Sequence, residues 1–329
     1  MIRLYYSFVF LFIISLFACD EMNETILPDA TGKPGDLLVV IDTSYYNNQL
    51  GDTIKSIFSV PQEGLPQREP LFNLISLPEK NFAPIFQTTR NIIIVNINKN
   101  NKPAIKLKEN QWANDQLVVS VDATDAENAM AIFSKNKAVF LDYFQKKELD
   151  RLKAKLSKIE NGKNVKMVKE HFGFKLLLDD LFILAKKDDG FMWFRKEKDI
   201  GGHPLSQGII IYTYPYDNDS IFDVKQLVAK RNYYTEKYLK NSRGAYMTSY
   251  EEYLPNGKEI NLNGYYAKEL RGLWHMKGDF MGGPYINISL VDEKNNRLVC
   301  IDGYVYCPKF DKREYLRELE AIAKTIQFN

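Results

Sequence analysis

Histidine is the side chain best suited to acid–base chemistry near neutral pH, and the chain of 329 residues contains 3 of them. His203 lies in the segment DIGGHPLSQG (199–208), whose glycines would let the backbone approach a ligand closely. This segment could contribute to a hydrolase site if the fold placed a carboxylate beside His203 in a pocket. The same composition is typical of an exposed loop between two strands, and both interpretations stay open.

Short catalytic motifs are absent from the sequence. It contains no G-x-S-x-G nucleophile elbow, no H-E-x-x-H zinc motif and no phosphate-binding G-x-x-x-x-G-K-[ST]. Adjacent carboxylates such as Asp179 and Asp180 would point to opposite faces of a strand, which disfavours their use as an acid–base pair. An active site would have to be assembled from dispersed residues, and no cofactor is expected.

Aromatic side chains are the other candidates for binding. Tyr212, Tyr214 and Tyr216 alternate in the segment IYTYPY, so they share one face of a strand. Trp193 and Trp274 fall on further predicted strands of the same half of the chain. An exposed face of this kind could stack on sugar rings or hold a protein partner, and the alternative is that it packs beneath a helix.

The two cysteines near the C-terminus stand in the segment VCIDGYVYC, downstream of the turn sequence EKNNR. We expect residues 297–307 to form one strand, with Gly303 as a bulge. Extended chain of this length separates the sulfurs of Cys300 and Cys307 by more than about 20 Å, so both thiols are predicted to be free. Two thiols without paired histidines also disfavour a zinc site, and no metal is expected.

The elements that must position these residues differ between the two halves of the chain. In the first half, apolar runs typical of buried parallel strands occur at 36–42, 91–98 and 116–122. A helix is expected over 46–59, and a capping box of Thr124 with Glu127 should begin a long helix that continues to Ile159. Alternating strands and helices predict an α/β layer domain over residues 36–170.

The second half predicts strands joined by tight turns, with few helices. Ser220 with Asp223, and Asp311 with Glu314, form capping boxes that should begin two of those helices. The strands are typical of antiparallel pairing, so residues 173–329 predict an antiparallel α+β sandwich domain. The predicted fold class is therefore α/β plus α+β, in that order along the chain.

The first residues of the chain resemble an export signal. Residues 4–18 are uncharged and too short to cross a bilayer, which favours a signal peptide over residues 1–18. The segment LFAC, which ends at Cys19, is similar to the bacterial lipobox, and this resemblance implies that Cys19 is acylated and anchors the chain to a membrane. Residues 19–35 are polar and aperiodic, as expected of a flexible tether.

Several segments together resemble a known family. The lipobox, TGKPGDLLVVID, RNIIIVNI, FMWFRKE and RLVCIDGYVYCPKFDKREYLRELEAI occur in an order similar to that of an uncharacterised Bacteroidetes lipoprotein family with a domain-of-unknown-function label. The resemblance covers essentially the whole chain and implies a lipoprotein of the gram-negative cell envelope, at the outer membrane. It implies no reaction. The second half is also similar, in its order of strands and helices, to PsbP/Mog1-like domains.

The charge of the chain narrows its partners. The formal net charge is +2, and acidic and basic residues are interspersed. This pattern argues against nucleic acid and leaves neutral or mixed polymers of sugar or peptide as candidate ligands. The leading hypothesis is a non-catalytic binding or envelope-assembly module that is held at the membrane through Cys19. The alternative is an envelope hydrolase with a dispersed active site near residues 199–208.

Overall fold

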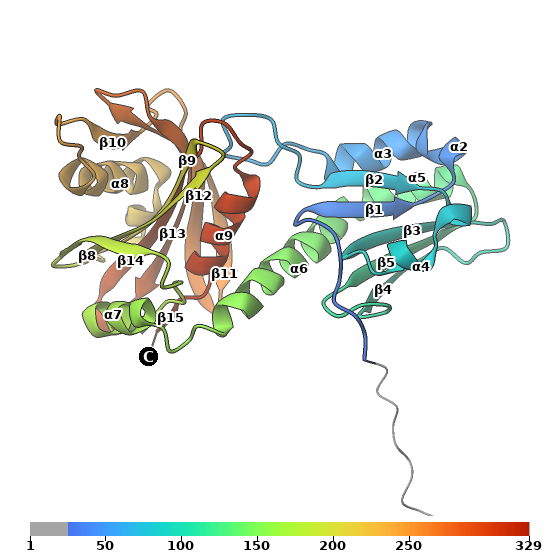
Figure 1. Cartoon of the computed structure of the whole chain (residues 1–329), viewed down its shortest axis with the longest axis horizontal. Coiled ribbons are helices and arrows are strands. Elements are labelled where there is room, and N and C mark those ends of the chain that lie inside the picture. Colours follow the sequence, from blue (N-terminus) through green and yellow to red (C-terminus); the bar gives the residue numbers. More distant parts are fainter. Residues whose placement is uncertain (1–25, 329) are drawn as a thin grey trace, which may run out of the picture.

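The computed structural model describes residues 26–328 and has two lobes, each built around its own sheet (Figure 1). The predicted signal peptide and Cys19 lie outside the described residues. Near the start of the described chain, the backbone N–H groups of Ala30 and Thr31 donate to the carbonyls of Asn114 and Thr88, at 3.1 and 2.8 Å. This part of the predicted tether is thus bonded to the first lobe. Within residues 26–328, no helix has both the length and the apolar character that crossing a membrane requires.

The first lobe contains a five-stranded sheet with the strand order β2-β1-β3-β5-β4. Its strands are β1 (Asp36–Val40), β2 (Asn73–Leu77), β3 (Asn91–Ile97), β4 (Ala104–Glu109) and β5 (Leu117–Ala123). All neighbouring strands pair in parallel except β4, which is antiparallel to β5. The three predicted apolar runs correspond to β1, β3 and β5. The sequence pattern does not predict β2 and β4, because both are edge strands whose side chains are largely exposed.

Side chains cover both faces of this sheet, as expected for strands with continuous apolar sequence. Leu37 and Val39 of β1 pack into the core beneath the helices, whereas Leu38 and Val40 pack on the opposite face with Phe82 nearby. The helical segments of this lobe are α2 (Thr43–Tyr46), α3 (Gln49–Phe58), η1 (Glu79–Asn81), α4 (Pro84–Gln87), α5 (Ala126–Lys135) and α6 (Lys137–Ser157).

The long helix predicted from Thr124 is divided at Asn136 into α5 and α6. Asn136 has φ −109° and ψ 20°, which interrupts the regular helix. The N-cap of α5 is Asp125, whose carboxylate accepts a hydrogen bond from the backbone N–H of Asn128 at 2.8 Å. The predicted capping box of Thr124 with Glu127 is therefore wrong, because the adjacent aspartate supplies the cap.

The second lobe contains an eight-stranded sheet with the order β10-β12-β13-β14-β9-β8-β7, in which β11 also pairs with β12. Its strands are β7 (Ile183–Asp188), β8 (Phe191–Ile200), β9 (His203–Pro215), β10 (Tyr246–Ser249), β11 (Asn256–Leu262), β12 (Tyr265–Lys277), β13 (Gly282–Asp292) and β14 (Arg297–Tyr306). Each of these pairings is antiparallel. A separate two-stranded sheet joins β6 (Phe174–Lys175) to β15 (Gln327–Phe328). The predicted fold class, an α/β part followed by an antiparallel α+β part, is confirmed.

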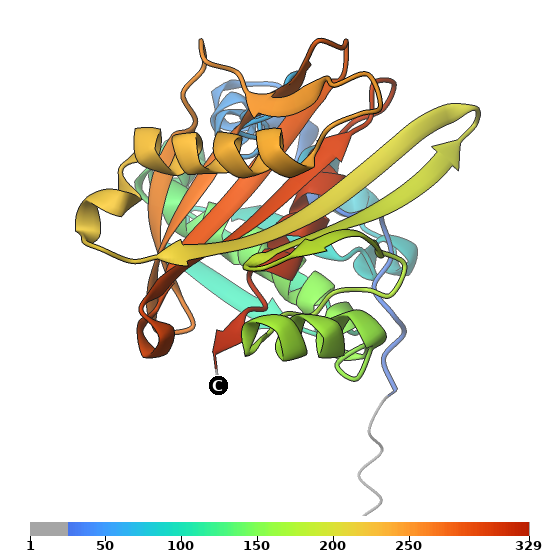
Figure 2. The same cartoon turned by 90° about the vertical axis from the view of Figure 1, so that its left-hand side faces the viewer.

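Helices lie on both faces of the second sheet, and Figure 2 shows one of them, α8, crossing in front of the strands. The helical segments here are α7 (Lys163–Phe172), η2 (Asp219–Phe222), α8 (Val224–Tyr238), η3 (Glu293–Asn295) and α9 (Arg313–Ala323). Successive residues of β14 alternate between the two cores, so Cys300 packs on the α8 side and Ile301 on the α9 side. Cys307 also packs on the α9 side, and both thiols are free and buried, as predicted.

Gly303 keeps the regular register of β14 and is not a bulge, so that prediction is wrong. It pairs with Ile286 of β13 and Ile209 of β9 without a shift. A Cβ atom at this position would lie 2.7 Å from the Cβ of Leu319. Glycine is required here because α9 approaches the sheet closely at this point.

The caps of α8 and α9 also differ from the predicted boxes. The N-cap of α8 is Asp223, whose carboxylate accepts from the backbone N–H groups of Lys225 and Gln226 at 2.9 and 3.3 Å. Ser220 instead lies within η2. Asp223 therefore acts as the cap itself rather than as the partner of Ser220.

The start of α9 is capped by a residue of the first lobe. Glu69 is 3% exposed, and its carboxylate oxygens accept from the backbone N–H groups of Lys312 and Arg313, both at 2.8 Å. A carboxylate at this end of a helix also interacts favourably with the helix dipole. The predicted box of Asp311 with Glu314 is therefore wrong, and the true cap ties the lobes together.

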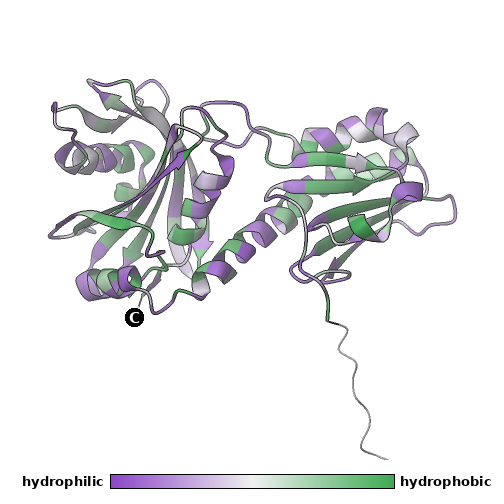
Figure 3. Cartoon of the chain, viewed as in Figure 1, coloured by the Kyte–Doolittle hydropathy of each residue, from purple (hydrophilic) through white to green (hydrophobic). Residues whose placement is uncertain are grey.

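Helix α6 contributes to the cores of both lobes. Phe140 and Phe144 pack in the first core, whereas Leu156 packs in the second, together with Val168 and Phe172 of α7. Figure 3 shows the matching pattern, with apolar strands in both sheets and mixed hydropathy along α6. The predicted domain boundaries, 36–170 and 173–329, stay a prediction.

Candidate functional site

His203 lies at the tip of the hairpin formed by β8 and β9. Gly201 and Gly202 form the two-residue turn, with φ of 60° and 78°, so most of the predicted loop 199–208 is strand. The imidazole of His203 lies edge-on against Phe310, with ring centroids 5.9 Å apart. Among the described residues, no carboxylate forms a hydrogen bond or ion pair with His203.

Two of the three candidate tyrosines lie beneath α8. Tyr212 is 1% exposed and Tyr214 is 8% exposed. Tyr234 of α8 stacks on Tyr212, with ring centroids 4.5 Å apart. Of the two alternatives for this face, packing under a helix describes both residues.

The two candidate tryptophans have different surroundings. Trp274 is buried, and its indole N–H donates to the carbonyl of Val305 at 3.3 Å. Trp193 is half-buried, donates to the hydroxyl of Tyr304 at 3.1 Å, and lies under the guanidinium of Arg195. Both indoles nevertheless contact Tyr304, whose ring meets Trp274 with centroids 5.5 Å apart, and both pack in the same core as Tyr212 and Tyr214.

A buried polar cluster lies between α8 and the sheet. Arg231 of α8 forms an ion pair with Asp302 of β14, with Nε 2.7 Å from Oδ2, and both side chains are fully buried. Asn287 also donates to Asp302, at 3.2 Å. Burial raises the pKa of the nearby Cys300 thiol to about 12, which makes it a poor nucleophile. This cluster is suited to fixing the helix on the sheet.

The third candidate tyrosine, Tyr216, lines a cavity of about 840 Å³ at one end of the second sheet. The aromatic and acidic side chains around this cavity, here called the tyrosine pocket, are Tyr216, Phe222, Tyr265, Tyr266, Asp219 and Glu293. None of the described residues that line the tyrosine pocket is basic. The pocket therefore combines aromatic faces with hydrogen-bond acceptors and negative charge.

Three connections bring these side chains together. η2 follows β9, η3 joins β13 to β14, and the turn Asn263–Gly264 joins β11 to β12. Strand pairing places all three at the same end of the sheet, since Arg297 is paired with both Asp292 and Pro215, and Ala267 near the start of β12 is paired with Leu290 near the end of β13. Asn263 and Gly264 have φ of 54° and 92°, as a tight hairpin turn requires.

The rings of the tyrosine pocket are accessible. Tyr265 is 37% exposed and Tyr266 is 47% exposed, whereas Phe222 is buried and meets Tyr266 edge-on, with centroids 4.9 Å apart. The hydroxyl of Tyr216 donates to the carboxylate of Asp219, and this hydrogen bond raises the pKa of Tyr216 above its usual value. Partly fixed, partly exposed rings of this kind can stack on the apolar face of a ligand.

The sequence signal for Tyr265 and Tyr266 is the segment NGYY. Asn-Gly between two strands indicates a hairpin turn, so the two tyrosines that follow it begin the second strand of that hairpin. Sequence analysis singled out Tyr216 but not these two residues. The reason is that β12 and β9 become neighbours of one cavity only through the pairing of β13 and β14 between them.

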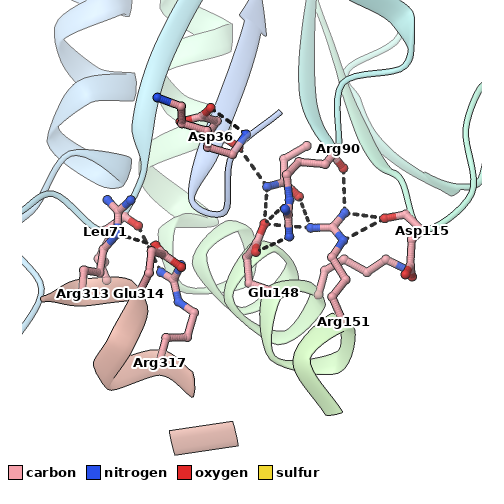
Figure 4. Close-up of polar contacts among 12 residues, drawn as sticks. Asp36, Leu71, Arg90, Asp115, Glu148, Arg151, Arg313, Glu314 and Arg317 are labelled. Atoms are coloured by element: carbon pink, nitrogen blue, oxygen red, sulfur yellow. Dashed lines mark hydrogen bonds and ion pairs between the residues drawn. The ribbon is translucent and has the colours of Figure 1, made fainter. Parts of the chain in front are cut away.

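One polar cluster fixes α6 on the first sheet, and a second joins the two lobes (Figure 4). In the first, Glu148 of α6 accepts hydrogen bonds from Arg90 at 2.7 and 3.0 Å, from Asn91 at 2.7 Å and from Arg151 at 2.8 Å. Arg151 also donates to the carbonyls of Arg90 and Asp115, at 2.7 and 2.8 Å. Burial lowers the pKa of Arg151 to about 10, and the charge of Glu148 opposes that effect.

The second cluster lies at the start of α9. Arg317 pairs with Glu314 at 2.7 Å and donates to the carbonyl of Leu71 at 3.3 Å. Arg313 donates to the carbonyl of Pro70. These contacts and the Glu69 cap attach the second lobe to the segment before β2. Among the described residues, no group of His, Cys, Asp and Glu side chains is arranged to hold a metal ion.

The fold and the pocket together define a two-lobed protein, α/β and then antiparallel α+β, with an aromatic, acidic cavity on its second lobe. The family described as Domain of unknown function (DUF4837) matches residues 161–325, and a second, Domain of unknown function (DUF8532), matches residues 30–157. The chain belongs to the DUF4837 family. This confirms the predicted resemblance to a family of unknown function, while its lipoprotein character stays a prediction.

Solved structures offer only distant likeness. The Saccharomyces cerevisiae Ran-binding protein Mog1p is 12% identical, with 47% of this chain and 91% of that chain covered at a TM-score of 0.28. LpqN, involved in cell envelope biogenesis of Mycobacterium tuberculosis, is 13% identical, with 47% and 83% covered at a TM-score of 0.26. Mog1 is thus among the similar structures, as the sequence resemblance predicted. No curated protein matches the chain.

Proposed function

We propose that this protein is a non-catalytic module of the cell envelope that binds a neutral carbohydrate polymer in the tyrosine pocket. The observation that carries the proposal is the grouping of Tyr216, Tyr265 and Tyr266 with two carboxylates around one accessible cavity. Tyrosine faces pack against the C–H faces of sugar rings, and carboxylates accept hydrogen bonds from sugar hydroxyls. A lining without basic residues disfavours anionic ligands.

The binding prediction is tested at Tyr266. The change Tyr266→Ala should weaken the affinity for a bound oligosaccharide by about tenfold, because it removes one stacking face. Isothermal titration calorimetry of the detergent-solubilised full chain with neutral glucan, xylan and N-acetylglucosamine oligomers measures it. Tyr253→Ala is the matched control, since Tyr253 is 63% exposed but lies outside the pocket.

Two outcomes would contradict the proposal. The first is that none of these oligomers binds to the unmodified protein. The second is that Tyr266→Ala and Tyr253→Ala change the affinity equally, because binding would then not involve the pocket. A released sugar product in the same titrations would favour the hydrolase alternative instead.

The membrane location is the other part of the proposal. It is supported by the lipobox-like segment that ends at Cys19, since such a segment directs acylation of its cysteine. Two or three acyl chains would anchor the chain firmly, because each buried methylene contributes about 0.8 kcal/mol. The acylated cysteine would hold both lobes at the envelope membrane, with the tyrosine pocket facing the surrounding polymers. The partners would then be the membrane itself and an envelope polymer.

Anchoring is tested by Cys19→Ser. Because serine oxygen cannot form the thioether, we expect this change to give either an uncleaved chain or a cleaved protein that moves from the detergent phase to the aqueous phase in a detergent-partition experiment. Cys307→Ala, which removes a buried thiol, should leave the partition unchanged. If the Cys19→Ser protein stayed in the detergent phase after verified cleavage of residues 1–18, the lipid anchor would be wrong.

A further inference from the structure

A second cavity, of about 740 Å³, lies between the two lobes. Its walls are α6, the segment that follows α3, strands β11 and β12, and α9. Asn263 lines this interdomain cleft, whereas the next residue, Gly264, lines the tyrosine pocket. The interdomain cleft is therefore a separate cavity with its own set of side chains, and these are mainly charged.

Most charges on the α9 side of the interdomain cleft neutralise one another. Arg271 pairs with Glu269 at 2.8 Å and with Glu320 at 2.7 Å. Lys324 pairs with the same carboxylates, at 3.1 and 2.6 Å. These cations lower the pKa of the Glu320 carboxyl to about 2 despite its burial. The two carboxylates are thus matched in charge by two cations, with one ion pair on each oxygen.

Lys153 of α6 faces this group without a partner of its own. Among the described residues its amine forms no ion pair or hydrogen bond. Asp150, one turn earlier, is paired with Lys146 at 3.1 Å. Burial lowers the pKa of Lys153, and the charges of Lys324 and Lys146 act in the same direction, against Asp150 and Glu320. Lys153 is therefore a half-buried cation that has carboxylates in its surroundings but no ion pair or hydrogen bond of its own among the described residues.

The remaining charged residues of the interdomain cleft do not supply an ion-pair partner for Lys153. Glu63 and Asp142 line it together with the cations Lys137 and Lys258. Lys137 lies at the opposite end of α6 from Lys153, at a distance of roughly 24 Å along the helix. Neither Glu63 nor Asp142 forms an ion pair with Lys153 among the described residues, so the amine has no bonded counter-charge in the cleft.

We propose that the interdomain cleft binds a small oxyanion, a phosphate or a carboxylate group, on the amine of Lys153. The bound group would supply the missing counter-charge and hydrogen-bond acceptors for an amine with three donors. The cavity gives it room, and the α6 and α9 contacts hold the walls in place. The tyrosine pocket is lined by carboxylates, which would repel the same oxyanion. The proposed oxyanion site is therefore separate from the proposed carbohydrate site.

The test uses inorganic phosphate and acetate as separate probes, titrated into the detergent-solubilised full chain at constant ionic strength. At least one anion should bind saturably, and Lys153→Met should weaken its affinity by about tenfold or more. Lys153→Arg should keep the affinity within about threefold, because arginine is also suited to oxyanions. Lys155→Met is the matched control, since Lys155 is an exposed lysine on α6 outside the cleft.

The pH dependence gives an independent readout. Because only the protonated amine attracts an anion, affinity of the unmodified protein should fall as the pH rises through the lowered pKa of Lys153, whereas that of Lys153→Arg should stay constant. Absence of saturable binding by both probes would overturn the proposal. Equal anion affinities of the unmodified and Lys153→Met proteins would also overturn the proposal. If Lys153→Met failed to fold, the pH profiles would decide: the same profile for the unmodified and Lys153→Arg proteins would contradict binding at Lys153.

Discussion

Replacing Asp302 by alanine should lower the free energy of unfolding of the second lobe by about 3–5 kcal/mol. The carboxylate of Asp302 is fully buried and accepts from Arg231 at 2.7 and 3.2 Å and from Asn287 at 3.2 Å. Its removal leaves the guanidinium of Arg231 buried without a counter-charge, over the ring of Tyr285. The cost of an unpaired buried charge exceeds that of the lost contact itself.

Urea unfolding followed by tryptophan fluorescence measures this effect, because Trp193 and Trp274 lie in the second lobe. Asp217→Ala, at an exposed aspartate near η2, is the control and should change stability by less than about 0.5 kcal/mol. The double change Arg231→Met with Asp302→Leu should be less destabilising than Asp302→Ala alone, since it leaves no charge unpaired. A loss below about 1 kcal/mol for Asp302→Ala would show that the ion pair does not hold α8 on the sheet.

The change Glu148→Ala should destabilise the first lobe by a comparable amount, about 3–5 kcal/mol. Glu148 is 1% exposed and accepts four hydrogen bonds from Arg90, Asn91 and Arg151. Without it, two guanidinium groups lie close together at the amino ends of the parallel strands, and Arg151 is only 6% exposed. Their mutual repulsion adds to the desolvation that already lowers the pKa of Arg151.

Two measurements separate this effect from a general weakening of α6. Hydrogen exchange of β1, β3 and β5 should accelerate in the Glu148→Ala protein, since these strands lie under the cluster. Asp142→Ala removes an exposed carboxylate from the same helix, and we expect it to leave both stability and exchange nearly unchanged. Equal effects of the two substitutions would mean that the Glu148 cluster contributes no more than a surface charge.

The sequence by itself determined the elements with strong hydrophobic patterns. The apolar runs of β1, β3 and β5 predict buried strands because such runs can only be covered on both faces. The spacing of Cys300 and Cys307 on one strand likewise excluded a disulfide, since extended backbone fixes the distance between their sulfurs. For the binding site, alternation predicted Tyr216 on the same strand as Tyr212 and Tyr214, whereas β9 ends at Pro215 and Tyr216 is the next residue. The sequence also gave no reason to group Tyr216 with Tyr265 and Tyr266.

Only the tertiary structure decided how polar residues are used. Glu148 and Arg151 belong to a charged stretch of α6 that is typical of a solvated face, yet they are buried against the first sheet. Glu69 lies in a loop sequence but caps a helix more than two hundred residues further along the chain. Periodicity reports which face of an element is apolar. It contains no information about which distant backbone or charge will meet a polar side chain, because that pairing exists only after the helices, the sheets and the two lobes have packed together.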